Sequence, residues 1–169
     1  MPGLHQVAEH LSLQAKTLTG DDADAFGRSA FNRYYYAAYL SVRELLASLD
    51  TSWEASPHSA IPDLLEITVM RQVRDQAKRM STSGLITIAR HHSLAKQAGQ
   101  ASSDIASILR AAYGVRVVAD YRPEQRVAFD RLEFRLAQHT HAEARNWKTR
   151  VDRAKKVLMS ISKELGIVY

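Results

Sequence analysis

The chain has 169 residues, 46% of them hydrophobic and 24% charged, which is typical of a folded globular protein and excludes an intrinsically disordered one. It contains no cysteine, which excludes disulfides, thiolate metal sites and a cysteine nucleophile and fits a reducing compartment, so we expect a cytoplasmic protein. The net charge of +5 favours contact with polyanions such as RNA, although an ordinary surplus of basic surface residues explains it equally well.

The length suits one domain, so we expect residues 1–169 to form a single helical domain. A first helix is predicted over residues 4–18, where apolar residues recur every three or four positions, and Gly20 is expected to stop it. A second helix is predicted over residues 22–49, with one buried stripe at Phe31, Tyr35, Ala38, Val42, Leu45 and Leu49. We find no signal peptide pattern and no apolar stretch of about 18 residues, so no membrane segment is expected.

Residues 51–61 show no periodicity and are rich in turn-forming residues, which predicts a surface loop. Pro62 suits the first position of a third helix, since its missing N–H would be unpaired there in any case. This helix is predicted to run to about Met80 and to be broken at residues 81–84. Residues 85–98 fit either a short extra helix or an extended loop.

A fourth helix is predicted to begin near Ser103, a suitable N-cap, and to end before Pro123. Residues 126–138 fit a crossing segment with some helix or extended structure. The fifth helix begins after Thr140, because Thr140 and Glu143 have the spacing of a capping box. Its apolar residues alternate three and four positions apart, as in a helical bundle, at Ala144, Trp147, Val151, Ala154, Leu158, Ile161 and Leu165. We find no run of alternating β-branched residues, so the predicted fold class is all-α, a bundle of about five main helices.

Two segments resemble motifs of the HEPN family of small helical proteins. Residues 30–39 read AFNRYYYAAY and are similar to the family's Ser-Arg-x-Tyr-Tyr-Ala-Ala-Phe signature. Residues 116–121 read RVVADY, which is similar to the Arg-x-x-Ala-Asp-Tyr ending of one large subgroup. Pro57-His58-Ser59 falls where that subgroup often carries a His-Ser pair. The resemblance spans roughly residues 22–121.

The resemblance implies an antiparallel bundle that forms a two-fold homodimer, with the fourth-helix motifs of both subunits facing a shared cleft. In nuclease members, an Arg and a following His cleave RNA without a metal. Such cleavage needs a proton acceptor, a proton donor and a cation near the phosphate. Arg116 matches the Arg, whereas Asp120 and Tyr121 stand where the His follows, so these three residues are the candidate catalytic group. Arg116 and Asp120 are equally well spaced for a structural ion pair.

His58 is a candidate substitute base, and His139 or His141 is a further one. The candidate RNA contacts are Arg33, Tyr36 and Arg122, because cationic and aromatic side chains together bind phosphates and bases. Tyr36 equally fits a core aromatic residue.

The resemblance therefore implies an RNA-targeting protein, with a metal-independent endoribonuclease of a toxin–antitoxin or phage-defence system as the specific expectation. A second reading is a non-catalytic partner of a small nucleotidyltransferase, which in some HEPN pairs modifies a Tyr beside the motif, here Tyr121. A third is a helical dimerisation or adaptor module. No cofactor or metal is expected, because we find no glycine-rich phosphate loop before a helix and no zinc-binding pattern.

Overall fold

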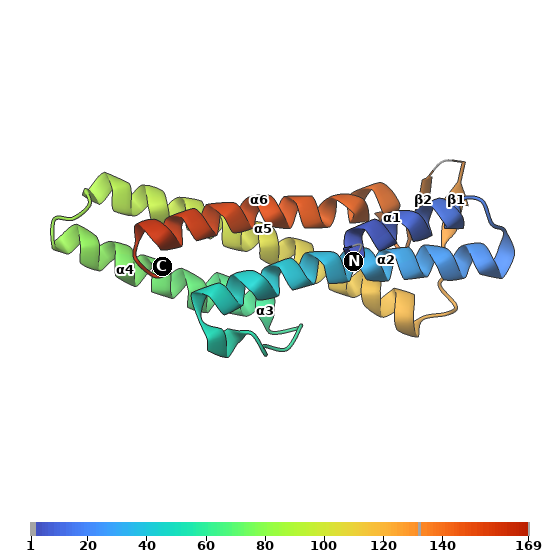
Figure 1. Ribbon diagram of the computed structural model, residues 1–169, viewed down its shortest axis with the longest axis horizontal. Helices are drawn as coiled ribbons and strands as arrows, with labels where there is room; N and C mark the ends of the chain where they lie inside the picture. The colour runs from blue at the N-terminus through green and yellow to red at the C-terminus, as the bar shows by residue number, and fades with distance from the viewer. Residues whose placement is uncertain (1–2, 132, 169) are drawn as a thin grey trace. The chain divides into compact units, whose positions relative to one another are not determined.

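The structure, a computed structural model, describes residues 3–131 and 133–168, and 76% of these residues are helical. The prediction of a mainly helical bundle is confirmed, with five long helices and one small sheet in the described chain. The α-helices are α1 (Leu4–Ala15), α2 (Gly20–Leu49), α3 (Ile61–Asp63), α4 (Met70–Thr82), α5 (Ile88–Tyr121) and α6 (His141–Glu164) (Figure 1).

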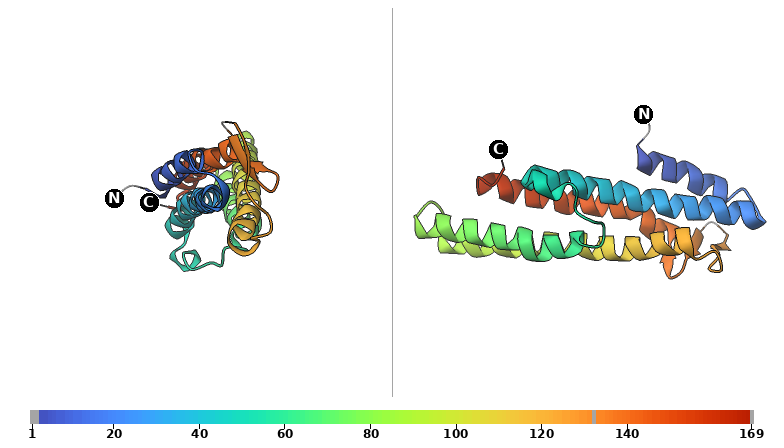
Figure 2. Two further views of the ribbon diagram at one scale, coloured as in Figure 1. Left: turned by 90° about the vertical axis from the view of Figure 1, so that its right-hand side faces the viewer. Right: turned by 90° about the horizontal axis from the view of Figure 1, so that it is seen from below.

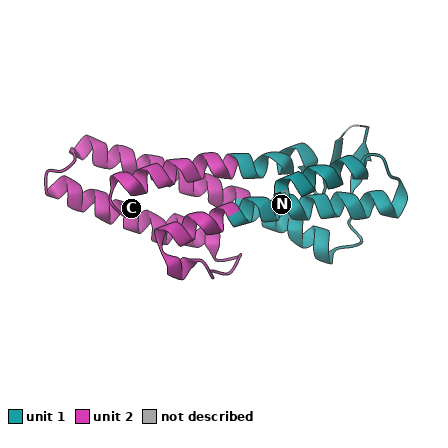
Figure 3. Cartoon of the chain, viewed as in Figure 1, with its two compact units in different colours: residues 1–40, 109–149 teal, residues 41–108, 150–169 magenta. Residues whose placement is uncertain are grey.

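The chain divides into two compact units, and three long helices contribute residues to both (Figure 3). Unit 1 consists of Met1–Leu40 and Leu109–Thr149, and unit 2 of Ser41–Ile108 and Arg150–Tyr169. In unit 1, α1 lies lengthwise along the first part of α2 (Figure 2). The prediction of a single domain stays a prediction.

Helix α2 has the buried stripe that its spacing predicts, since Phe31, Tyr35, Ala38, Val42, Leu45 and Leu49 are all buried. The start of this helix differs from the prediction. Helix α1 already ends at Ala15, and Gly20 is the first residue of α2 rather than the stop of α1. Its φ of +61° lies in the left-handed region, which glycine adopts without a steric cost.

A small antiparallel sheet in unit 1 forms from the segment that the sequence left open. Its strands pair in the order β1-β2-β3, with bounds Ala128–Asp130, Glu133–Leu136 and His139–Thr140. Phe134 of β2 is buried and meets Phe31 of α2 edge to face, with 5.7 Å between the ring centroids. Gly27 of α2 lets Val127, just before β1, approach the helix closely, because a Cβ atom at Gly27 would lie 3.1 Å from Val127 Cγ1.

The predicted third helix of unit 2 is confirmed, but its middle is a π-helix. Helix α3 continues directly into the π-helix η2 (Leu64–Val69) and then into α4. Its buried residues recur every four positions, at Ile61, Leu65, Val69, Val73 and Ala77. In an α-helix with 3.6 residues per turn, such a stripe would drift around the axis by about 40° at each step. A π-helix has about 4.4 residues per turn, so a four-residue step through η2 drifts by about 33° in the opposite sense and offsets part of the α-helical drift.

Helix α5 begins at Ile88, and the predicted start near Ser103 is wrong. The Thr87 hydroxyl caps this end by accepting a hydrogen bond from the backbone N–H of Arg90 at 3.1 Å. Ser103 lies inside the helix and is exposed. The buried stripe extends into the segment that the sequence left open, through Leu94, Ala98, Ala101 and Ile105.

Helix α6 begins and packs as predicted. Thr140 caps it, with the Glu143 backbone N–H donating to Thr140 Oγ1 at 3.1 Å, and all seven residues of the predicted stripe are buried. Only half of the expected capping box forms, because the Glu143 carboxylate contacts His139 Nδ1 at 2.9 Å. None of the helices among the described residues has the length and apolar character needed to cross a bilayer.

Candidate functional site

The end of α5 in unit 1 brings the three candidate catalytic residues together. Arg116 Nε lies 2.9 Å from Asp120 Oδ2, one helical turn further on, so the spacing correctly predicted an ion pair. The Arg116 guanidinium also lies over the Tyr121 ring, 5.2 Å from its centroid. Cation, carboxylate and phenol therefore occupy one small cluster.

Arg116 is held by several partners. Burial lowers the pKa of its guanidinium, but hydrogen bonds to the Tyr36 and Tyr121 hydroxyls and the charge of Asp120 outweigh burial, so the pKa is raised. Its Nε atom is buried and has no well-directed hydrogen bond among the described residues, so charge rather than hydrogen-bond geometry dominates its contact with Asp120. Only 19% of the side chain is exposed. Arg116 is thus a positioned cation with little freedom to move.

The tyrosines around this cluster are largely core residues. Tyr35 is buried, and its ring contacts those of Tyr36, Tyr39 and Tyr113 with centroid distances of 5.1, 5.8 and 6.1 Å. Burial raises the pKa of Tyr35, so its phenol stays protonated. Tyr36 is half-buried and faces Arg116, whereas 64% of Tyr121 is exposed. Tyr121 is therefore the aromatic residue of the cluster that offers a face to solvent.

Both carboxylate oxygens of Asp120 have partners. Oδ2 faces Arg116, and Oδ1 accepts a hydrogen bond from the Asn32 side-chain amide at 2.5 Å. Asp120 therefore holds Arg116 and Asn32 in place, with both of its oxygens engaged.

A small cavity of about 120 Å³ lies beside Asp120, between α2 and the end of α5. Its lining includes the Ser29 hydroxyl, the Asn32 amide and Arg33. Arg33 is exposed and forms no ion pair with any described residue. Arg122 is also exposed, but its guanidinium lies 3.8 Å from Glu124. Among the candidate RNA contacts, Arg33 is thus an available cation at a polar cavity.

Sequence reasoning missed Arg28, which fixes the end of α5. One terminal nitrogen donates to the carbonyls of Val118 and Ala119 at 2.9 and 2.8 Å, and the other to those of Arg122 and Gln125 at 2.6 and 2.8 Å. Its Nε donates to Asp24 at 2.9 Å. The end of α5 thus receives a cation and two hydrogen bonds, and the segment after it receives two more. No signal could have found this site, because backbone carbonyls carry no sequence identity.

The candidate histidines have structural partners of their own. His58 lies in unit 2, in the turn that precedes α3, and its role as a substitute base stays a prediction. His141 is buried and stacks on Phe134 with 4.7 Å between ring centroids. Its Nε2 lies 3.2 Å from Lys16 Nζ, and its Nδ1 contacts Glu133. Because an ammonium group only donates, Nε2 accepts and the ring proton sits on Nδ1, facing Glu133.

Glu133 makes this cluster sensitive to acid. Burial raises the pKa of Glu133, but hydrogen bonds from His141 and from the Phe134 and Ala142 backbone N–H groups outweigh burial, so the pKa is lowered. A carboxyl with a lowered pKa in the folded state contributes stability above its ordinary pKa of 4.5. That contribution is lost as the pH falls through the folded-state value.

We therefore expect Glu133→Gln to lower the free energy of unfolding at pH 7 by about 1 kcal/mol or less, because Glu133 is 40% exposed and water screens the pair. Urea unfolding of both proteins between pH 7 and pH 3 measures this difference. It should shrink below pH 4.5, where the wild-type carboxyl becomes protonated. If the difference in unfolding free energy stayed constant down to pH 3, the stabilisation would not come from the charge of the Glu133 carboxylate.

Comparisons with protein-family models, with curated protein sequences and with solved structures found no match to this chain. The HEPN-like pattern thus stands as a resemblance of short motifs. Within the described residues, no three His, Asp or Glu side chains come together as metal ligands.

Proposed function

We propose that this protein is a HEPN-like RNA-binding protein that holds single-stranded RNA at the end of α5 in unit 1. The RNA would contact the Arg33 surface, by which we mean Ser29, Asn32, Arg33, Asp120 and Tyr121. The observation that carries the proposal is Arg33, an exposed cation without an ion-pair partner among the described residues at the edge of a polar cavity. RNA phosphates are the natural partners of such a group.

Neighbouring groups supply the other requirements of RNA binding. Ser29 and Asn32 add hydroxyl and amide groups beside Arg33. Arg116 offsets the negative charge of Asp120, which would otherwise repel a phosphate. One face of the exposed Tyr121 ring meets the Arg116 guanidinium, and stacking of a base on such a ring contributes about 1–3 kcal/mol.

Arg33→Gln should weaken RNA binding about tenfold, because hydrogen bonds to charged groups contribute about 1.5–3 kcal/mol. Fluorescence anisotropy with a labelled single-stranded RNA of mixed sequence measures the dissociation constant. In a plot of the logarithm of the binding constant against the logarithm of the salt concentration, the slope for the variant should be smaller in magnitude than that of the wild type by about 0.7. The matched control is Arg135→Gln, since Arg135 is also exposed and forms no ion pair with a described residue. Equal losses in both variants would show that net charge, rather than this surface, governs binding.

A second candidate function is metal-independent RNA cleavage at the same place. The observation that favours it is the proximity of Arg116, Asp120 and Tyr121. In this reaction the RNA 2′-hydroxyl would give its proton to Asp120 and attack the adjacent phosphorus, with Arg116 beside the phosphate oxygens. The bond from phosphorus to the 5′-oxygen would break, leaving a 2′,3′-cyclic phosphate, and Tyr121 would donate a proton to the departing 5′-oxygen. Both oxygens of Asp120 are already engaged, by Arg116 and by Asn32, so binding without cleavage is the function that we favour.

Incubation of total RNA with the protein in the presence of a chelator separates the two functions. Intact RNA together with binding that depends on Arg33 supports the binding function. Cleavage that is lost in Arg116→Ala would establish the nuclease instead. The homodimer and the nucleotidyltransferase partner stay predictions from the resemblance.

A further inference from the structure

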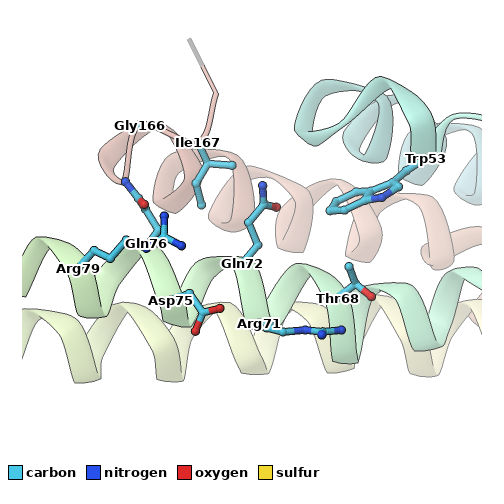
Figure 4. Close-up of a pocket in the computed structure, with 9 residues that line it drawn as sticks. All are labelled: Trp53, Thr68, Arg71, Gln72, Asp75, Gln76, Arg79, Gly166 and Ile167. Carbon is cyan, nitrogen blue, oxygen red and sulfur yellow. The ribbon is translucent and has the colours of Figure 1, made fainter.

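Unit 2 contains a cavity of about 510 Å³ that the proposed RNA contact does not use (Figure 4). One side is α4, with Arg71, Gln72 and Arg79, and the opposite side holds Trp53 and Ile167. Sites for small ligands usually have volumes of about 300–1,000 Å³, so the cavity suits a small molecule rather than a folded partner.

Trp53 is held in the cavity by a local turn. It ends the 3-10 helix η1 (Thr51–Trp53), whose N-cap is Asp50. Asp50 accepts hydrogen bonds from the Ser52 backbone N–H and hydroxyl at 2.8 and 2.6 Å, which lower its pKa. The half-buried indole ring of Trp53 extends toward α4 (Figure 4). It therefore offers a fixed aromatic face at one end of the cavity.

The chain end of α6 closes the other side. Gly166 has a φ of +65°, and its backbone N–H donates to Lys163 O at 3.1 Å. The Ile167 N–H donates to Ser162 O at 2.8 Å, which completes the glycine-based turn that often ends a helix. This turn places Ile167 at the cavity that Gln72 also lines (Figure 4). Gln76 of α4 fastens it by donating to Leu165 O at 3.0 Å.

Gln72 lines the cavity on the side of α4 (Figure 4). Its Oε1 is buried, and neither amide atom has a hydrogen-bond partner among the described residues. A buried polar atom without a partner costs about 1–3 kcal/mol, so such atoms commonly mark a place where another group binds. Rotation of the side chain would present a donor and an acceptor side by side. Gln pairs in this way with a planar ring edge that also carries a donor and an acceptor, such as the N6 and N7 edge of adenine.

Two arginines and one carboxylate, that of Asp75, line the cavity, so its net charge favours an anion. Arg71 and Arg79 are exposed, and neither forms an ion pair with any described residue, although Asp75 lies four positions from each. Their guanidinium groups are therefore available to a ligand, and guanidinium binds phosphate in a two-pronged manner.

We propose that this cavity binds a small anionic molecule with a planar nitrogen-containing ring, of the chemical class of a nucleoside monophosphate. The ring stacks on Trp53, its edge pairs with Gln72, and its anionic group contacts Arg71 or Arg79. This site is separate from the RNA contact, because all of its residues belong to unit 2.

Titration of the full chain with adenosine 5′-monophosphate tests the proposal. Calorimetry measures affinity, and the fluorescence of Trp53 reports stacking, since the only other tryptophan, Trp147, is fully buried. We expect binding in the micromolar range with quenching of Trp53. Adenosine and ribose 5-phosphate, which lack the anion and the ring respectively, should each bind at least tenfold more weakly. Equal binding of ribose 5-phosphate, or no heat at 5 mM of the full ligand, would overturn the proposal.

Variants locate the ligand within the unit. Arg71→Gln and Arg79→Gln together, and Gln72→Met alone, should each weaken binding about tenfold or more, because hydrogen bonds to charged groups and buried amides contribute about 1–3 kcal/mol. Arg74→Gln is the matched control, since Arg74 is an exposed residue of the same helix that does not line the cavity. Thermal melts of each variant show that it is folded. An equal loss in Arg74→Gln would mean that the helix attracts anions without a built site.

Discussion

Arg28→Met should lower the free energy of unfolding by about 3 kcal/mol, and this loss should be among the largest that a single charged residue of the chain produces. The side chain is only 12% exposed, and its removal takes one donor from Asp24 Oδ2 and from the carbonyls of Val118 and Ala119. The Arg122 backbone N–H still binds Val118 O at 3.1 Å, and the Val127 N–H still binds Asp24 Oδ1 at 2.6 Å. Breaking a buried charged pair costs about 3–5 kcal/mol, and the partial exposure of the other two carbonyls places the expected loss at the lower end. Urea unfolding followed by circular dichroism measures it.

Two further variants identify the cause of this loss. Arg28→Lys keeps the charge but lacks the planar fork of donors, so it should recover less than half of the lost stability. Arg33→Met removes an exposed Arg that follows Arg28 on the same helix. It should change the free energy of unfolding by no more than about 0.5 kcal/mol. If Arg28→Met were as stable as Arg33→Met, the guanidinium would not bind the end of α5 in solution.

Phe134→Ala should lower the free energy of unfolding by about 4 kcal/mol, which is within the range for truncation of a buried Phe. Phe134 is 1% exposed and contacts Phe31 and His141, so its removal leaves a cavity between the sheet and the helices of unit 1. The same urea unfolding experiment gives the value. Phe129→Ala is the control, since Phe129 is 40% exposed and should lose about 1 kcal/mol. A loss at Phe134 no larger than this would mean that the sheet is not packed on the core.

Helices whose buried residues follow the period of 3.6 could be predicted from the sequence almost completely. The stripes of α2 and α6 are buried as their spacing predicts. The start of α5 could not be predicted in this way. Ser103 is a residue type that often caps a helix, but here it lies within one. The earlier start could have been recognised from three apolar residues that continue the stripe toward the N-terminus, namely Leu94, Ala98 and Ala101. The sheet escaped prediction because its strands are at most four residues long and contain no β-branched run.

The candidate site was predictable only where neighbours in sequence are neighbours in space. The contact between Arg116 and Asp120 follows from their spacing on one helix. By contrast, the hydrogen bond from Asn32 to Asp120 joins two helices that are far apart in the sequence. Four of the partners of Arg28 are backbone carbonyls, which no sequence pattern marks. The cavity at Trp53 combines three separate segments of the chain, so no local pattern indicates it.

The π-helical turn η2 determines where the chain of unit 2 can change in length. A residue deleted within Leu64–Val69 could be absorbed by a return to α-helical winding, which would leave the following side chains near their present directions. A deletion further along α4 would instead turn every later residue by about 100° around the axis. Arg79 would then point away from the cavity, so related chains that keep the ligand cavity should vary in length at η2 and not between Met70 and Arg79.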